Sequence, residues 1–299
     1  MKKELKGVMA LIPTPLTTDG KIDEDDIRSE IDFVMQNGCD SVGVLAGIGE
    51  GYLVSLQDWR KVAKTAIDHM NGKSPVLIGC PTMGTGKAVE MVKEAEDLGA
   101  DAVLAFNPQG MGPYKIEGLY RHFKEMTEAA DILIIPYARG EPPPGGDPIP
   151  FDVIKKLVED GAIKYHKYAF RDCENLRRLN KTFEDKLFIF CGADAWTLRF
   201  LLLGCKGIMT ATAAVLPKEN VELLKLVQKG EIEAARKYWY EKFLVWNDSG
   251  FFENWQTAHK LALKLMGVIK STRAPIPQAE MGDYQVEEIR ALLSYLRKV

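Results

Sequence analysis

The chain of 299 residues has few cysteines, and no motif links them. Its five cysteines are an odd number and contain no C-x-x-C pair. This pattern indicates neither a disulfide framework nor a cysteine-based zinc site. Unpaired thiols are typical of proteins in a reducing compartment, so we expect a cytoplasmic protein.

Long apolar runs and an excess of one charge are also missing. No run approaches the roughly 18 apolar residues that span a bilayer, and the charged start at Met1–Lys6 does not resemble a signal peptide. The 39 Lys and Arg nearly balance the 42 Asp and Glu, which gives a net charge of -3. This balance argues against nucleic acid or an anionic membrane as the main partner. We therefore expect a small-molecule partner, no nucleic acid and no membrane.

Histidine is scarce, and its positions do not form a metal-binding pattern. The chain has four histidines, scattered over predicted helices and the outer face of one strand: His69, His122, His166 and His259. A metal-dependent lyase would need His, Asp or Glu clustered at strand ends. A phosphate-binding barrel would need glycine-rich loops after the seventh and eighth strands, and these loops have no such pair of motifs. We expect no metal site.

Short apolar runs alternate along the chain with longer segments of helical period. Eight runs are predicted strands: Val8–Pro13, Ser41–Ala46, Pro75–Cys80, Ala102–Phe106, Ile132–Tyr137, Ile163–Lys167, Phe188–Cys191 and Gly207–Ala211. The predicted helices are Glu24–Asn37, Leu56–Met70, Gly86–Leu98, Ile116–Ala130, Pro150–Glu159, Cys173–Phe183 and Ala195–Leu203, with an eighth from about Lys218. Strands buried on both faces read as near-continuous apolar runs. The pattern predicts an α/β fold, a (β/α)8 TIM barrel.

The end of the chain is helical without intervening strands. Three further helices are predicted at Glu231–Trp246, Trp255–Met266 and Val286–Lys298. No low-complexity linker separates them from the barrel. We predict a catalytic barrel domain at residues 1–225 and a C-terminal helical extension, packed on the barrel, at residues 226–299.

Two chemically active side chains end neighbouring strands of this barrel. Tyr137 closes the fifth predicted strand and Lys167 the sixth, and active sites of (β/α)8 barrels lie at the C-terminal strand ends. Inside a barrel a lysine is poorly solvated as an ammonium, so its pKa falls and a free amine becomes available to form a Schiff base. A neighbouring tyrosine can transfer the protons that this step requires. The pair predicts covalent catalysis on a small carbonyl compound.

The second predicted strand runs into a glycine-bearing turn, Leu45–Glu50. Such a turn can direct backbone N–H groups at an anion, and Gly47 and Ile48 are the candidates. An amine, a phenol and an anion-binding turn in one pocket fit a 2-oxo acid. The turn would hold its carboxylate, and Lys167 would attack its ketone carbon.

Simpler roles remain open for these residues. Lys164 competes with Lys167, but strand alternation places Lys164 on the outer face with His166 and directs Lys167 inward. Tyr137 could be a packed barrel residue, and Gly47–Ile48 a plain tight turn.

Three polar residues near the strand ends have expected roles of their own. We expect Glu50 to be structural and to pair with the backbone or a neighbour. We expect Asp194 to cap the helix that follows its strand. Arg139 is equally compatible with a substrate-carboxylate clamp and with a solvated loop residue.

The order and spacing of several motifs together resemble one known group of proteins. The chain is similar to the dihydrodipicolinate synthase / N-acetylneuraminate lyase superfamily of pyruvate-handling Schiff-base barrels over nearly its whole length. The motifs that carry the resemblance are Gly7–Leu16, Gly49-Glu50, Tyr137, Lys167, Gly192-Ala193-Asp194 and Leu203–Met209.

The resemblance implies a function, a site and an assembly. It implies a Schiff-base-forming lyase, an aldolase or a dehydratase, that acts on pyruvate or a related 2-oxo acid and needs no cofactor because the lysine imine supplies the chemistry. It also implies a homo-oligomer, either a dimer or a tetramer. The expected catalytic residues are Lys167 and Tyr137, and the expected substrate-binding residues are Gly47, Ile48, Arg139 and Met209.

The chain also departs from the pattern of these proteins. Their paired hydroxyl residues in the anion-binding turn are replaced here by Gly47 and Ile48, and the glycine two positions before the lysine is Tyr165. Pro142 stands where dihydrodipicolinate synthases carry an arginine for a distal carboxylate. These changes favour a different aldehyde partner or a deoxy sugar acid. A true 4-hydroxy-tetrahydrodipicolinate synthase and a non-catalytic 2-oxo acid-binding barrel remain the alternatives.

Overall fold

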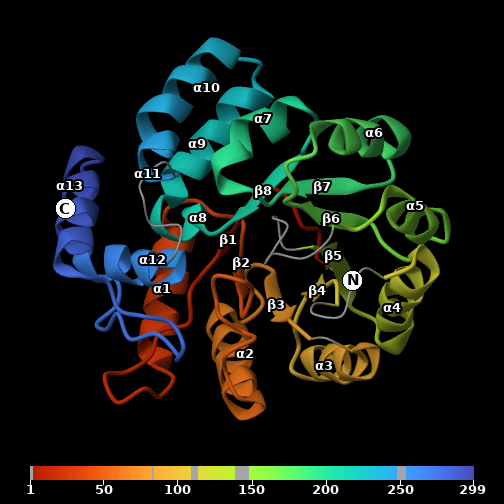
Figure 1. Cartoon of the computed structure of the whole chain (residues 1–299), viewed down its shortest axis with the longest axis horizontal. Helices are drawn as coiled ribbons and strands as arrows, with labels where there is room; N and C mark the ends of the chain where they lie inside the picture. The colour runs from red at the N-terminus through yellow and green to blue at the C-terminus, as the bar shows by residue number, and fades with distance from the viewer. Residues whose placement is uncertain (1–2, 83, 109–113, 139–147, 248–253) are drawn as a thin grey trace.

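The protein forms a closed barrel of eight parallel strands in a computed structural model that describes residues 3–82, 84–108, 114–138, 148–247 and 254–299 (Figure 1). The strands follow one another around the barrel in chain order. They are β1 Val8–Leu11, β2 Ser41–Val44, β3 Val76–Cys80, β4 Ala102–Phe106, β5 Leu133–Tyr137, β6 Tyr165–Tyr168, β7 Phe188–Cys191 and β8 Gly207–Thr210. The predicted (β/α)8 TIM barrel is confirmed.

Helices surround this barrel and continue beyond it. The first group is α1 Glu24–Gln36, α2 Leu56–Met70, α3 Thr85–Asp97, α4 Ile116–Ala129, α5 Phe151–Glu159, α6 Cys173–Phe183 and α7 Thr197–Leu202, which a 3-10 turn, η1 Asp194–Trp196, precedes. The second group is α8 Thr212–Val215, α9 Pro217–Gln228, α10 Ile232–Tyr238, the π-helical turn η2 Trp239–Leu244, α11 Val245–Asn247, α12 Trp255–Leu265 and α13 Asp283–Tyr295. The short α8 and the π-helical turn were not predicted.

Local sequence explains where several helices begin. Ser55 precedes α2, and its side chain accepts a hydrogen bond from the Asp58 N–H. Asp172 does the same for the Asn175 N–H at the start of α6. Such caps satisfy N–H groups that have no partner inside the helix. Both helices therefore have the bounds that the sequence predicts.

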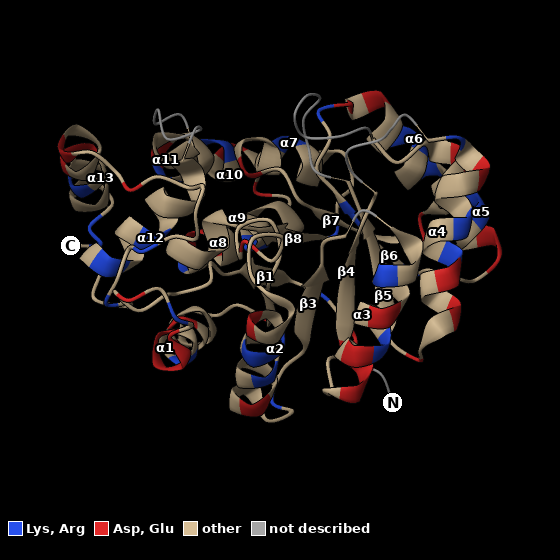
Figure 2. Ribbon diagram, turned by 60° about the horizontal axis from the view of Figure 1, so that its bottom comes forward, with Lys and Arg blue, Asp and Glu red and all other residues tan. Residues whose placement is uncertain are grey.

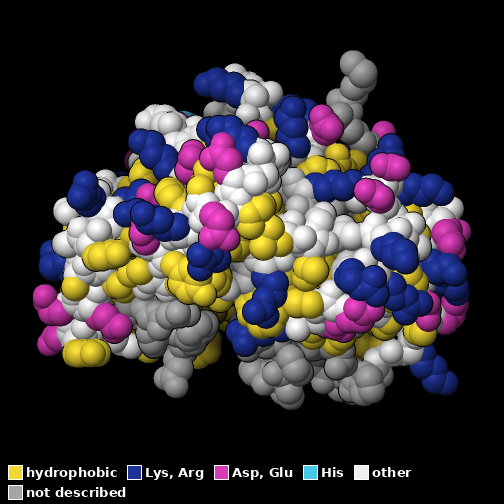
Figure 3. All heavy atoms as spheres, turned by 90° about the horizontal axis from the view of Figure 1, so that it is seen from above, with side chains coloured by type: hydrophobic (Ala, Val, Ile, Leu, Met, Phe, Trp, Pro, Cys, Tyr) yellow, Lys and Arg dark blue, Asp and Glu magenta, His cyan; other side chains and the backbone are white. Residues whose placement is uncertain are grey.

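Charge is nearly absent from the strands. The eight strands contain one residue among Lys, Arg, Asp and Glu, which is Lys167 in β6. Figure 2 shows the charged residues mainly on the outer helices, and on the face in Figure 3 the two signs are interspersed. Burying a charge costs free energy unless the charge is paired, so the one lysine within the strands is a candidate functional residue.

Aromatic side chains fill the barrel below Lys167. The rings of Tyr165, Phe188 and Phe190 pack together with centroids 4.7 to 6.3 Å apart. The Tyr165 hydroxyl accepts a hydrogen bond from the Leu5 N–H at 3.2 Å, beyond the N-terminal end of the barrel. The bulky residue two positions before the lysine is therefore part of the packed floor.

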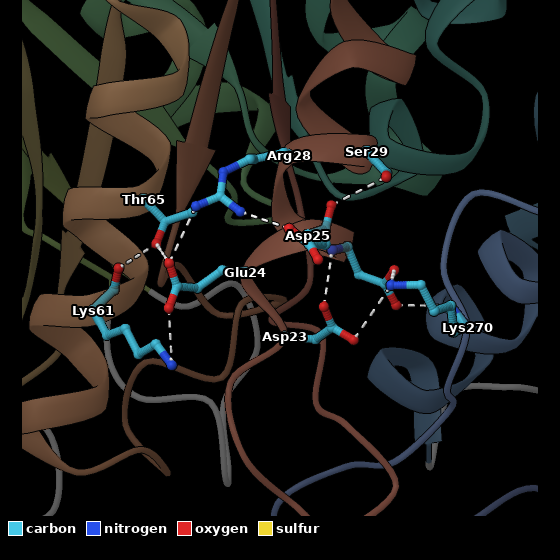
Figure 4. Close-up of polar contacts among 9 residues, drawn as sticks. Asp23, Glu24, Asp25, Arg28, Ser29, Lys61, Thr65 and Lys270 are labelled. Atoms are coloured by element: carbon cyan, nitrogen blue, oxygen red, sulfur yellow. Dashed lines mark hydrogen bonds and ion pairs between the residues drawn. The ribbon is translucent and has the colours of Figure 1, made fainter.

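The C-terminal segment is attached to the barrel by charged contacts. The Lys270 N–H donates to Asp26 Oδ2 at 2.7 Å, and Lys270 Nζ lies 2.9 Å from Asp26 Oδ1. Figure 4 shows Lys270 beside Asp23 at the start of α1, and on the other side of this helix end Glu24 reaches Lys61 of α2. The extension is thus fixed to the start of α1, which is in turn paired with α2. Across the described ranges, no helix is long and apolar enough to cross a membrane.

Candidate active site

Lys167 and Tyr137 lie side by side at the C-terminal ends of β6 and β5. They are the one residue pair in register between these strands. Lys167 is 5% exposed and Tyr137 7%, and Lys167 Nζ lies 4.1 Å from the centre of the Tyr137 ring. The predicted pair is therefore buried, adjacent and at the end of the barrel where active sites form.

The surroundings of Lys167 favour its neutral amine. Burial lowers the pKa of Lys167 to about 8, although the nearby Asp194 and Cys191 act in the opposite direction. A pKa near 8 leaves about a tenth of this side chain as free amine at pH 7. The side chain thus has the protonation behaviour that a Schiff-base nucleophile requires.

Space for the lysine stem comes from a glycine on the next strand end. A Cβ added to Gly192 would lie 2.5 Å from Lys167 Cε and 2.7 Å from Cγ. Any side chain at position 192 would therefore displace the lysine. The glycine of the G-x-D motif is explained by this close approach.

Asp194 also contributes to the lysine's surroundings, and the prediction that it caps the following helix is wrong. Neither η1 nor α7 has a side-chain cap. Instead, Asp194 Oδ1 accepts a hydrogen bond from the Thr212 N–H at 2.6 Å. The carboxylate thereby joins the loop after β7 to the start of α8, because satisfying that N–H outweighs the local cap.

The turn after β2 is held in an unusual backbone conformation. Leu45 and Glu50, at its two ends, have φ values of 60° and 55°, which is rare for residues other than glycine. The Leu45 carbonyl oxygen would lie 2.1 Å from a Cβ on Gly79, and Thr14 Oγ1 donates to the Gly49 carbonyl at 2.5 Å. Contacts with Gly79 of β3 and with Thr14 after β1 thus hold the turn in this conformation, as is common at functional sites.

Gly47 and Ile48 lie inside this turn. The Glu50 N–H donates a hydrogen bond to the Gly47 carbonyl oxygen. Among the described residues, the N–H groups of Gly47 and Ile48 make no main-chain hydrogen bond. The Ile48 side chain is 1% exposed and belongs to the same barrel-interior cluster as Tyr137 and Met209. The turn and Met209 of β8 therefore border the same interior as Tyr137.

Two features of the site were missed by sequence reasoning. Trp255, at the start of α12, packs against the barrel-interior cluster, and its Cη2 would lie 3.9 Å from a Cβ on Gly47. Lys260 forms a fully buried ion pair with Glu50, with 2.6 Å between Nζ and Oε2. No local signal links these residues to the turn, because about 200 positions separate them in the chain.

The remaining predicted residues are accounted for as follows. Lys164 is exposed, and His166 is buried on the outer side of the strand, where Nδ1 bonds to the Pro136 carbonyl at 2.8 Å. The expectation that Glu50 pairs with a neighbour is confirmed by its ion pair. Arg139 and Pro142 lie outside the described residues.

Among the described residues, no group of three or more His, Cys, Asp or Glu side chains is arranged to hold a metal ion.

Comparisons with known proteins agree with this geometry. The sequence profile of the dihydrodipicolinate synthetase family matches residues 4–295. The chain belongs to this family. The 4-hydroxy-tetrahydrodipicolinate synthase of Thermodesulfovibrio yellowstonii is 32% identical over 290 residues, which are 96% of this chain and 97% of that protein. The same enzyme of Methanopyrus kandleri is 32% identical over 279 residues, 92% of each chain.

Solved structures of this family share the whole fold. The dihydrodipicolinate synthase of Thermotoga maritima has a TM-score of 0.91 at 27% identity, with 98% of this chain and 99% of that chain covered. The synthase from Aquifex aeolicus has a TM-score of 0.90 at 26% identity, with 98% of both chains covered. As a member of the dihydrodipicolinate synthetase family, the protein is a Schiff-base-forming lyase for pyruvate or a related 2-oxo acid.

Proposed function

We propose that Lys167 is the Schiff-base nucleophile of this lyase and that Tyr137 transfers its protons. The free amine of Lys167 adds to the ketone carbon of a 2-oxo acid, and the resulting carbinolamine loses water to give an iminium ion. The iminium nitrogen then accepts the electron pair released when the bond to a C3 proton, or the bond between C3 and C4, breaks. An enamine results, and its protonation and hydrolysis return the amine.

The observation that carries this proposal is the buried pair at the ends of β5 and β6. Lys167 Nζ lies 4.1 Å from the Tyr137 ring centre, which supports a role for the neighbouring phenol in both the addition and the loss of water. A positioned general acid or base contributes about 10²–10⁴-fold to rate. Because the iminium itself stores the electron pair, the proposal requires no metal and no organic cofactor.

The turn after β2 supplies the carboxylate site in this proposal. The N–H groups of Gly47 and Ile48 bind the substrate carboxylate, and Met209 forms part of the apolar wall beside it. Charge-assisted hydrogen bonds to backbone N–H groups suit an anion at this position. Support comes from the fixed left-handed ends of the turn and from the shared interior cluster of Ile48 and Met209.

We propose a deoxy sugar acid in preference to pyruvate with aspartate semialdehyde. The turn lacks relay hydroxyls, and Pro142 replaces the arginine expected for a distal carboxylate. An unpaired substrate carboxylate loses about 1.5–3 kcal/mol, roughly 10- to 100-fold in rate. Arg139 is the one candidate clamp nearby in the sequence. Measuring kcat/KM for both substrate types decides the matter, and efficient synthesis from aspartate semialdehyde that is lost in Arg139→Ala would restore the biosynthetic role.

Borohydride reduction in the presence of 2-oxo acids tests the covalent step itself. With pyruvate we expect a mass increase of one reduced pyruvyl group, absent from Lys167→Ala and retained in the matched variant Lys164→Ala. Absence of an adduct with pyruvate and with 2-oxo-3-deoxy sugar acids alike would refute the mechanism. Turnover of any of these acids would exclude the alternative of a non-catalytic binding barrel.

The location, the assembly and the domain division of the enzyme are also proposals. We propose a cytoplasmic homo-oligomer, a dimer or a tetramer, although one solved relative at 27% identity is described as a monomeric dihydrodipicolinate synthase variant. We also propose that residues 1–225 are the catalytic barrel domain and that residues 226–299 are an extension packed on it. Sedimentation of the full chain would distinguish the assembly states.

A further inference from the structure

Helix α12 of the C-terminal extension is attached to the turn that borders the active site. Gln256 Nε2 donates to the Tyr52 hydroxyl at 3.1 Å, and the buried ion pair joins Lys260 to Glu50. At the first residue of this helix, the indole of Trp255 lies against Gly47. The first turns of α12 therefore have a fixed position beside the proposed carboxylate site.

His259, one turn into α12, is held in one orientation by its neighbours. Its ring packs nearly perpendicular to two indoles, with centroids 5.4 Å from Trp246 and 6.0 Å from Trp255. Nδ1 lies 2.7 Å from the Trp255 carbonyl oxygen. A carbonyl can only accept, so Nδ1 carries the proton and Nε2 presents a lone pair.

The lone pair of His259 is not used by any of the described residues. The side chain is 6% exposed, and among these residues its Nε2 is buried without a hydrogen-bond partner. Leaving a buried polar group unsatisfied is costly, and such groups in folded proteins call for an explanation. A hydrogen-bond donor supplied from outside the chain would satisfy this nitrogen.

His259 and Lys167 share an electrostatic neighbour. Helix α12 packs against α8, whose first residue, Thr212, donates its N–H to Asp194. The Asp194 carboxylate raises the pKa of Lys167 and that of His259, in each case against a larger lowering by burial. The net lowering of the His259 pKa keeps its imidazole neutral at pH 7, so Nε2 remains an acceptor. Through its bond to Thr212, Asp194 thus connects the loop after β7, where Gly192 contacts Lys167, with the helix on which α12 packs.

We propose that His259 is a specificity-determining residue whose Nε2 accepts a hydrogen bond from a hydroxyl of the substrate, beyond its 2-oxo acid head. The substrate class is therefore a hydroxylated 2-oxo acid. A neutral lone pair accepts from O–H groups and repels a second carboxylate. This inference rests on the proposed Schiff-base function and extends it from the reacting head of the substrate to its tail.

Comparing two reactions of the same variants tests this role. In His259→Phe a flat ring remains between the indoles but the acceptor is lost. We expect kcat/KM for cleavage or dehydration of 2-oxo-3-deoxy sugar acids to fall about 10- to 100-fold, while borohydride trapping of pyruvate, which has no hydroxyl tail, is unchanged. His259→Gln, which carries an amide oxygen at a similar reach, should recover part of the loss. The same change at the half-buried His69 of α2, His69→Phe, is the matched control and should alter neither reaction.

Each contrary result has a distinct meaning. Unchanged kcat/KM in His259→Phe, or equal losses of sugar-acid turnover and pyruvate trapping, would overturn the role of His259 in specificity. So would a wild-type chain that traps pyruvate but turns over none of the hydroxylated acids. Absence of any adduct in the wild-type chain would instead refute the Schiff-base proposal on which the inference rests.

Discussion

Two buried lysines in this protein have opposite surroundings. At the interface of α12 with the turn after β2, Lys260 Nζ lies 2.6 Å from Glu50 Oε2 and 3.1 Å from the Arg273 carbonyl oxygen. At the end of β6, Lys167 Nζ lies over the Tyr137 ring, and no salt bridge to it is found in the described ranges. One ammonium is neutralised by a carboxylate, whereas the other has only an aromatic face and a more distant charge.

The difference shows that burial alone does not make a lysine reactive. A buried ammonium with a bonded carboxylate remains an ammonium, because the pair offsets the cost of desolvation. A buried ammonium without such a partner loses its proton more readily. Lys260 is accordingly a structural residue that attaches the extension, and Lys167 is the candidate nucleophile. Substituting both lysines by methionine, which has a similar stem and no charge, compares the two regions directly.

The largest expected effect is the loss of activity in Lys167→Met. Without an amine there is no imine, so we expect turnover of every 2-oxo acid substrate to fall by about 10⁴-fold or more. Steady-state kinetics measure this loss, and circular dichroism confirms that the fold is kept. Turnover near the wild-type level would place the nucleophile elsewhere.

The next effect concerns the phenol that distinguishes the two lysine environments. Tyr137→Phe keeps the ring beneath Lys167 and removes the hydroxyl, so kcat should fall by about 10²–10⁴-fold with little change in stability. Single-turnover kinetics should show that both formation and release of the covalent intermediate are slowed. An unaltered kcat would assign the proton transfers to another group.

Lys260→Met should lower stability without removing the nucleophile. Breaking a buried ion pair leaves the Glu50 carboxyl without its cation, and we expect the free energy of unfolding to fall by about 3–5 kcal/mol. Denaturant unfolding measures this change. The double variant Lys260→Met with Glu50→Leu should recover much of the loss, since the Glu50 carboxylate is removed together with its cation. A double variant as unstable as the single one would show that packing, and not charge, accounts for the effect.

The change in the free energy of unfolding should be smallest in Lys167→Met, and its sign should be opposite to that in Lys260→Met. The pKa of this lysine is lowered from 10.5 to about 8 in the folded chain, so burial of its charged form opposes folding. We expect the methionine variant to be more stable by about 1–3 kcal/mol near pH 7. The gain should be complete below pH 8 and should disappear as the pH rises to 10.5. Destabilisation at pH 7 would contradict the unfavourable desolvation of Lys167.

The sequence predicts the barrel and the adjacency of Tyr137 and Lys167 because both follow from strand patterns. Alternation directs Lys167 inward and Lys164 outward, and strand order brings Tyr137 beside Lys167. The positions of Trp255, His259 and Lys260 depend on contacts with distant elements that no periodicity encodes. Asp194 is misassigned for the same reason, since its partner is the N–H of Thr212 at the start of α8 and not the adjacent helix.

The contrast between the two lysines can be measured in a single labelling experiment. The native full chain is treated briefly with a small amine-acylating reagent across a range of pH, and the extent of labelling at Lys167, Lys260 and the exposed Lys164 is read by peptide mapping. We expect labelling of Lys167 to rise with a midpoint near pH 8 and the fully buried Lys260 to remain unlabelled. Added pyruvate should protect Lys167 alone. Labelling of Lys167 that follows the same pH curve as Lys164, without protection by any 2-oxo acid, would contradict its assignment as the nucleophile.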